Sequence, residues 1–193
     1  MKNNKTTILV FALLIIACSL YRVWDGRPWG FAPQIAMALF AGSVIKDKRF
    51  SFMVPLFSML VSDAIYQVLY SQGLTEIKGF YAGQLSNYIL FTLITLIGFF
   101  IKKNNIGSII LGSLVGVAFF FLASNFLVWI GGGLDISNHP YPKTFSGLME
   151  CYTAGLPFLR GSVLATLLFN GIFFGCYYLY GRFVARSVQP VKA

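Results

Sequence analysis

One carboxylate lies well inside a long apolar stretch of this chain, at Asp63. An ionised carboxylate at the middle of a bilayer costs about 2.5–3.5 kcal/mol on insertion scales, so such a residue usually has a function or a buried partner. Asp63 could accept hydrogen bonds from a ligand, bind a cation, or pair with Arg22 or Arg27. It could equally join a buried polar network with Ser62. The sequence leaves both interpretations open.

Other side chains that could bind a ligand lie near the ends of apolar stretches. Asn125 and Trp129 end one such stretch, Tyr141 follows in a Gly- and Pro-rich segment, and Trp29 lies in the turn-rich segment 25–33. Asn125 could instead bond to a neighbouring helix, and Trp129 could be a belt residue at a membrane surface. The predicted substrate-binding residues are Asp63, Asn125, Trp129, Tyr141 and Trp29.

Residue types that support catalysis or bind metals are sparse. His139 is the only histidine, and without a nearby Cys or carboxylate cluster it makes a poor metal site. Cys18, Cys151 and Cys176 have neither metal-ligand spacing nor the pattern of a disulfide framework. No G-x-S-x-G, Walker or G-x-G-x-x-G motif occurs. We therefore expect no enzyme, no metal site, no cofactor and no nucleotide hydrolysis by this chain.

The composition defines the elements that must position these residues. The 193 residues are 57% hydrophobic and only 11% charged, and the mean hydropathy is +0.73. This exceeds what a soluble core of one domain needs, so the surplus faces a lipid bilayer. The net charge of +9 is spread over short connectors and forms no basic helix, so no nucleic acid is expected as a partner. The composition predicts a polytopic membrane protein.

The apolar stretches predict a single all-α domain over residues 1–193, with six transmembrane helices. The second stretch is short for a span, so it could tilt little, thin the bilayer, or be shielded by neighbours. A short interfacial helix at 144–155 and a break at 156–158 are expected before the last span. The predicted spans are 6–23, 33–45, 50–70, 81–101, 106–130 and 162–184.

Small residues recur at helical spacing on two of these spans. Ser108, Gly112 and Gly116 are each four residues apart, and Gly171 and Gly175 repeat the spacing later. Such stripes let two helices approach closely, which favours packing within the bundle. In a protein that does not transport, the same stripes would be the surfaces of a scaffold or assembly subunit.

The distribution of Lys and Arg predicts an orientation. With a cytoplasmic N-terminus, six crossings place ten of the 15 basic residues inside, and the other five outside: Arg22, Arg27, Lys78, Lys143 and Arg160. We therefore expect a bacterial inner membrane protein with both termini in the cytoplasm. The residues before Cys18 loosely match a lipoprotein cleavage box, but the membrane-like sequence downstream favours an uncleaved first helix.

Several short motifs, in order from about 22 to 178, resemble a family of small bacterial membrane proteins of uncharacterised function (DUF6580-like). They are FAPQIAMALFAG at 31–42, Pro55, Ser62–Asp63, NFLVW at 125–129, YPKT at 141–144, Gly147–Leu148, Cys151–Tyr152 and LPF at 156–158. That family is grouped with transport proteins and resembles the substrate-binding S components of energy-coupling-factor (ECF) transporters.

This resemblance implies a six-helix, S-component-like subunit that takes up a small, vitamin-like molecule from the outer side. Its ligand would lie in the outer half of the bundle, beneath the loops at 25–32, 71–80 and 131–142. An ECF-type energising module is the implied partner, although Ala12 and Ala17 are five residues apart where S components carry docking alanines four apart. The alternative function is a non-transporting scaffold or assembly subunit.

Overall fold

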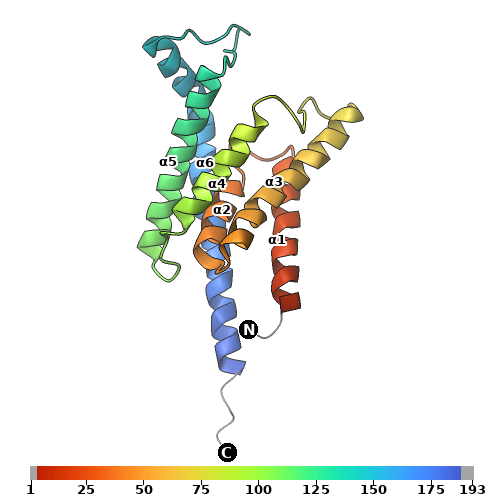
Figure 1. Ribbon diagram of the computed structural model, residues 1–193, viewed down its shortest axis with the longest axis vertical. Helices are drawn as coiled ribbons and strands as arrows, with labels where there is room; N and C mark the ends of the chain where they lie inside the picture. The colour runs from red at the N-terminus through yellow and green to blue at the C-terminus, as the bar shows by residue number, and fades with distance from the viewer. Residues whose placement is uncertain (1–3, 188–193) are drawn as a thin grey trace, which may run out of the picture.

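The computed structural model describes residues 4–187, and its regular structure there consists of six helices with one isolated bridge between Leu134 and Pro140. The start of α1 and the end of α6 lie at the same end of the bundle, the lower end in Figure 1. The connections 24–33, 72–83 and 131–144 lie toward the opposite end, which we call the loop end. The helices are α1 (Asn4–Val23), α2 (Gln34–Val44), α3 (Lys48–Ser71), α4 (Gln84–Gly98), α5 (Ile106–Ile130) and α6 (Phe145–Ser187).

Three of the described helices, α3, α5 and α6, are long and apolar enough to cross a membrane. Large aliphatic side chains point outward along the bundle: Leu13 of α1 is 57% exposed, Leu111 of α5 64% and Leu164 of α6 52%. Extended apolar surfaces of this kind are rare on proteins that face water and are required of helices that face lipid. The lengths and compositions of these helices indicate a membrane protein.

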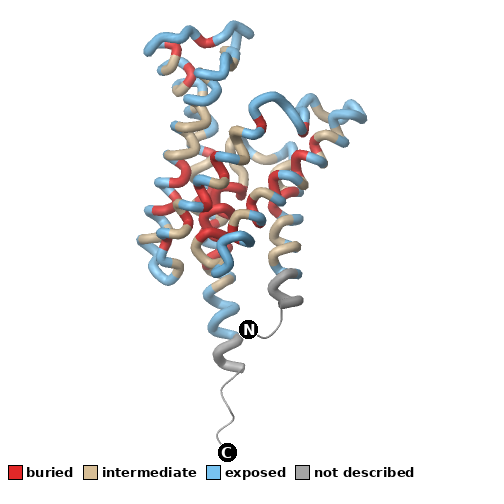
Figure 2. Tube along the Cα trace, viewed as in Figure 1, coloured by how far each residue is buried: buried red, intermediate tan, exposed pale blue. Residues whose placement is uncertain are grey.

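Helix α2 occupies the centre of the bundle. Every residue from Gln34 to Gly42 is buried, and α3, α4, α5 and α6 all pack against this helix. Figure 2 shows the buried residues gathered in this region. With 11 residues, α2 rises only about 17 Å, which is too short to cross the hydrocarbon of a bilayer. The sequence allowed three explanations for this short stretch, and the structure contains one of them, the shielding of α2 by neighbouring helices.

Glycines allow the central helices to approach closely. Gly42 of α2 faces Gly98 of α4, where an added Cβ would lie 2.5 Å from the carbonyl oxygen of Leu39. The small-residue stripe of α5 is also used within the bundle. A Cβ at Gly116 would lie 3.0 Å from Cδ1 of Leu39, and one at Gly112 would lie 2.5 Å from Cδ1 of Ile101.

The predicted break at 156–158 is wrong, because helix α6 continues from Phe145 to Ser187. Pro157 removes one backbone donor and crowds the carbonyl group one turn before it, which costs about 3 kcal/mol in a helix interior. Neighbouring segments hold the helix on both sides of the proline. Gly155 packs against Asn125 of α5, and Gly161 packs against the Trp29 carbonyl in the α1–α2 connection. Close tertiary packing thus keeps the backbone helical through this position.

Candidate functional site

Asp63 lies at the centre of a network that joins α1, α3 and α4. Its Oδ1 accepts a hydrogen bond from Arg22 Nη1 at 2.5 Å. Its Oδ2 accepts from Tyr88 Oη at 2.8 Å and from Gln84 Nε2. The carboxylate is only 1% exposed, and these charge-assisted bonds offset the loss of its hydration. Both carboxylate oxygens are therefore used within the protein.

The same network fixes the last turn of α1 against α3. Arg22 Nη1 also donates to Ser62 Oγ at 2.5 Å. The main-chain oxygen of Arg22 accepts from Tyr66 Oη at 2.8 Å and from Arg27 Nε at 2.7 Å. Among the alternatives expected for Asp63, the structure contains the ion pair with Arg22 and the polar network with Ser62.

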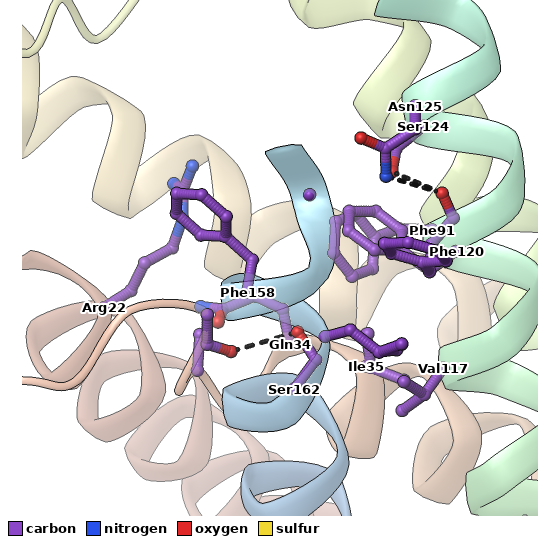
Figure 3. Close-up of a pocket in the computed structure, with 15 residues that line it drawn as sticks. Arg22, Gln34, Ile35, Phe91, Val117, Phe120, Ser124, Asn125, Phe158 and Ser162 are labelled. Atoms are coloured by element: carbon purple, nitrogen blue, oxygen red, sulfur yellow. Dashed lines mark hydrogen bonds between the residues drawn. The ribbon is translucent and has the colours of Figure 1, made fainter. Parts of the chain in front are cut away.

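A cavity of about 310 Å³ lies beside this network, toward the loop end and among α2, α4, α5 and α6. Figure 3 shows the side chains that surround it. Its wall is mainly apolar and aromatic, and Arg22 is the one charged residue that lines it. The apolar wall comprises Ile35, Phe91, Val117, Phe120, Phe121, Phe158 and Leu159, and the polar side chains are Arg22, Gln34, Ser124, Asn125 and Ser162.

Gln34, at the start of α2, lines the cavity and has a side-chain oxygen without a partner. The side chain is 3% exposed, its Nε2 donates to the Cys18 carbonyl oxygen at 3.4 Å, and its Oε1 has no hydrogen-bond partner. Turning the amide over would place two acceptor oxygens together, so the oxygen is the end left without a partner. A buried acceptor without a donor costs about 1–3 kcal/mol. A ligand N–H or O–H group would remove that cost.

Asn125 of α5 lines the cavity at the end away from Gln34 (Figure 3). Its Nδ2 donates to the carbonyl oxygen of Phe121, one turn earlier in the same helix, at 2.8 Å. The side chain also packs on Gly155 of α6, where an added Cβ would lie 2.6 Å from Asn125 Oδ1. Asn125 is therefore both a lining residue and part of the contact between α5 and α6.

Aromatic rings form two sides of the cavity. Phe91 and Phe120 lie on one side with ring centroids 5.3 Å apart, and Phe158 lies on the other (Figure 3). Trp29 stacks on the outer face of this arrangement, with its ring 5.7 Å from that of Phe158 and 12° from parallel. Trp29 is 71% exposed and does not line the cavity. Its connection to the site is its ring contact with Phe158.

Trp129 and Tyr141 lie outside this cavity, in and beside the α5–α6 connection. Trp129 Nε1 donates to the Pro142 carbonyl oxygen at 2.8 Å, and Lys143 Nζ donates to the Trp129 carbonyl oxygen. The main-chain N–H of Tyr141 donates to the Gly133 carbonyl oxygen at 3.1 Å. Burial raises the pKa of the Tyr141 hydroxyl. These contacts organise the connection, and neither side chain is among the residues that line the cavity.

A polar stripe on α6 leads away from the cavity toward the opposite end. Ser162, Thr166 and Asn170 are each one turn apart, and Asn170 Nδ2 donates to Ser113 Oγ of α5 at 2.7 Å. Thr166 Oγ1 and Asn170 Oδ1 are buried without a hydrogen-bond partner. Helix α6 thus buries two further unsatisfied oxygens.

Among the side chains that the structure describes, those of residues 9–183, no group of three His, Cys, Asp or Glu could hold a metal ion. His139 has a local role in the α5–α6 connection. Its main-chain N–H donates to Asp135 Oδ1 at 2.9 Å, and this bond is the main reason that the pKa of the Asp135 carboxyl lies below its ordinary value.

Sequence reasoning missed most of the cavity wall, including Gln34, Phe91, Phe120 and Phe158. Gln34 carried a usable signal, because it is a polar residue that directly precedes a wholly apolar run. The phenylalanines carried none, since they resemble the many aromatic residues that face lipid. The structure brings Asn125 to the cavity directly, and connects Trp29 and Asp63 to it through Phe158 and Arg22.

These features define a helical membrane protein with a ligand-sized cavity in its bundle. The chain belongs to the family of unknown function DUF6580, whose sequence model matches residues 2–188. This match confirms the family to which the short motifs pointed. No curated protein and no solved structure matches the chain.

Proposed function

We propose that this protein binds a small amphipathic molecule in the cavity among α2, α4, α5 and α6 and serves its transport across a bacterial inner membrane. The observation that carries the proposal is the cavity itself. Its volume is about 310 Å³, its wall is mainly apolar and aromatic, and one of its lining residues, Gln34, has a side-chain oxygen without a partner. Sites for small molecules typically combine a mostly apolar lining with a few placed polar groups.

The position of the cavity fits uptake from the outer side. If both termini are cytoplasmic, as the distribution of Lys and Arg predicts, then the loop end faces outward. The cavity would then lie in the outer half of the bundle, as in an S-component-like subunit. A vitamin-like molecule with a planar ring and an N–H or O–H group suits Phe91, Phe158 and Gln34.

The proposal assigns no catalysis and no cofactor to this chain. Since the sequence contains no nucleotide-binding motif, accumulation of the ligand would draw on a partner such as an ECF-type module, or on an ion gradient. The likeness to S components rests on the short motifs alone, because no solved structure matches the chain.

Ligand capture by matched variants tests the proposal. The purified protein is incubated with a small-molecule extract of bacterial cells, washed and denatured, and the released compounds are identified by mass spectrometry. We expect one compound to be enriched on the wild type and lost from Ser124→Trp, which fills the cavity. Leu122→Trp, on the exposed face of the same helix, should retain it. No enrichment, or equal enrichment on both variants, would show the proposal to be wrong.

The second candidate function, a scaffold or assembly subunit, is favoured by one feature of α6. A Cβ added at Gly171 or Gly175 meets nothing within 4 Å, so this small pair is open to another helix. Copurification from native membranes distinguishes the two functions. A stoichiometric protein partner that is released by Gly171→Leu, together with an empty cavity, would support the scaffold.

A further inference from the structure

We propose a second site, for an oxyanion, on the loop side of the Arg22–Asp63 pair and separate from the cavity. A pocket of about 350 Å³ lies there, between the ends of α1 and α3 and the segments that follow them. Six of its lining residues carry charge or a hydroxyl group: Arg22, Arg27, Lys78, Asp63, Tyr66 and Tyr81.

The charge in this pocket is unbalanced. Asp63 contributes one negative charge, but its Oδ1 is bound by Arg22, and its Oδ2 accepts from two other side chains. Among residues 9–183, whose side chains the structure describes, Arg22–Asp63 is the one ion pair within 4 Å, so neither Arg27 nor Lys78 has a carboxylate partner there. Two positive charges thus remain uncompensated, and they favour an anion.

The donors in the pocket are arranged for such a ligand. Arg27 uses Nε to bind the Arg22 carbonyl oxygen at 2.7 Å, which orients the guanidinium and leaves its two terminal amino groups for a ligand. A guanidinium that presents two parallel N–H groups matches phosphate or carboxylate oxygens. Lys78 Nζ lies 5.5 Å from the centre of the Tyr70 ring, close to the same pocket.

Tyr81 supplies a further donor. Its Oη accepts from Asn87 Nδ2 at 2.7 Å, so the hydroxyl proton is available to a ligand. A tyrosine hydroxyl has an ordinary pKa of about 10, so it is protonated at neutral pH and can donate.

The distribution of basic residues along the chain supports the same site. Lys and Arg are depleted from the outer loops of membrane proteins, and the orientation predicted above leaves only five of the 15 outside. Three of those five line this one pocket. Anionic lipid headgroups and soluble phosphate offer the same chemistry, since each presents a phosphate group to the donors.

Thermal unfolding of the full chain in neutral detergent tests the site. One arm titrates inorganic phosphate against chloride at constant ionic strength, and the other titrates dioctanoyl phosphatidylglycerol against dioctanoyl phosphatidylcholine. We expect a saturable rise in Tm in at least one arm. A rise with phosphate identifies a soluble anion as the ligand, and a rise with phosphatidylglycerol alone identifies a lipid headgroup.

Variants of the lining residues test whether the rise in Tm comes from binding in this pocket. Arg27→Gln and Lys78→Gln should each raise the half-saturating concentration about tenfold, which is the effect of losing one charge-assisted hydrogen bond. The matched control is Lys143→Gln, which removes an exposed lysine that does not line the pocket. Lys78 is itself exposed, so its substitution tests the site even if Arg27→Gln disturbs the fold.

Two results would overturn the inference: no anion-specific stabilisation of the wild type, or equal half-saturation of Lys78→Gln and Lys143→Gln. The site does not depend on the proposed function. Ser124→Trp should bind the anion normally even though its cavity is filled.

Discussion

Arg22 Nη1 lies 2.5 Å from Asp63 Oδ1, and Arg22 lines both the cavity and the oxyanion pocket. Asp63 itself lines only the pocket and has both oxygens occupied by protein donors. Asp63 therefore affects the cavity by fixing the position of Arg22, which lines it. It is a positioning residue that fixes the end of α1 to α3 and α4.

We expect Asp63→Asn to lower the free energy of unfolding by about 3 kcal/mol, because removing one partner of a buried pair leaves the other charge unpaired. Adding Arg22→Gln should recover part of this loss, since a neutral pair avoids the cost of the unpaired charge. Chemical unfolding in detergent measures both variants. A double variant less stable than Asp63→Asn would contradict this account of the pair.

Substitutions in and beside the α5–α6 connection should loosen this connection without changing ligand binding in the cavity. Trp129→Phe removes the donor to Pro142 and should increase proteolysis of the segment 131–144. Because neither Trp129 nor Tyr141 lines the cavity, we expect Trp129→Phe and Tyr141→Phe to retain the captured compound at wild-type levels. Loss of the compound from either variant, with the fold intact, would place the ligand under this connection instead.

The positions of the helices could largely be predicted, because long apolar runs and their polar ends are properties of local sequence. The expected stretch 106–130 coincides with α5, and 33–45 differs from α2 by one residue at each end. Continuity through Pro157 could not be predicted, since it depends on Asn125 and Trp29, which are far away in the chain. The cavity wall was hidden for the same reason, as its residues come from five separate segments.

The hydrogen-bond partners of Asp63 could be predicted only in part from the sequence. The cost of a carboxylate in an apolar run indicated a partner, and Arg22 was one of two candidates. Gln84 and Tyr88 could not be foreseen, because their approach to Asp63 depends on the packing of α4 against α3.

Thr166 provides a test of the unsatisfied oxygens on α6. Its Oγ1 is buried without a partner, whereas the buried Thr95 hydroxyl donates to the Phe91 carbonyl oxygen at 2.8 Å. We expect Thr166→Val to raise the free energy of unfolding by about 1 kcal/mol, and Thr95→Val to lower it by about 1 kcal/mol. Destabilisation by Thr166→Val equal to that by Thr95→Val would show that the Thr166 hydroxyl has a partner.

The turn at Asp135 should weaken in acid. The main-chain N–H groups of His139 and Ser137 donate to Asp135 Oδ1 at 2.9 Å and 2.8 Å, and they hold the pKa of this carboxyl below its ordinary value of 3.8. A lowered folded pKa means that the carboxylate stabilises the turn fully above the unfolded pKa. This contribution is lost as the pH falls through the lower, folded pKa.

Pepsin digestion measures that loss. We expect Asp135→Asn to be cleaved in the segment 131–144 faster than the wild type near pH 4.5, and the ratio of the two rates to fall toward one as the pH is lowered to about 2. The ratio cancels the pH dependence of the protease itself. Asp25→Asn, in a different connection, is the control. A ratio that does not change with pH would contradict the role given to Asp135.

The central claim is that the cavity holds a small molecule through Gln34. Native mass spectrometry of protein gently extracted from bacterial membranes tests it most directly, by comparing the bound fraction of the wild type with that of Gln34→Met. We expect a discrete non-lipid mass on the wild type and at least a tenfold weaker retention by Gln34→Met, which has no oxygen for the ligand to bind. A wild-type protein without a bound small molecule, or equal retention by Gln34→Met, would contradict the claim.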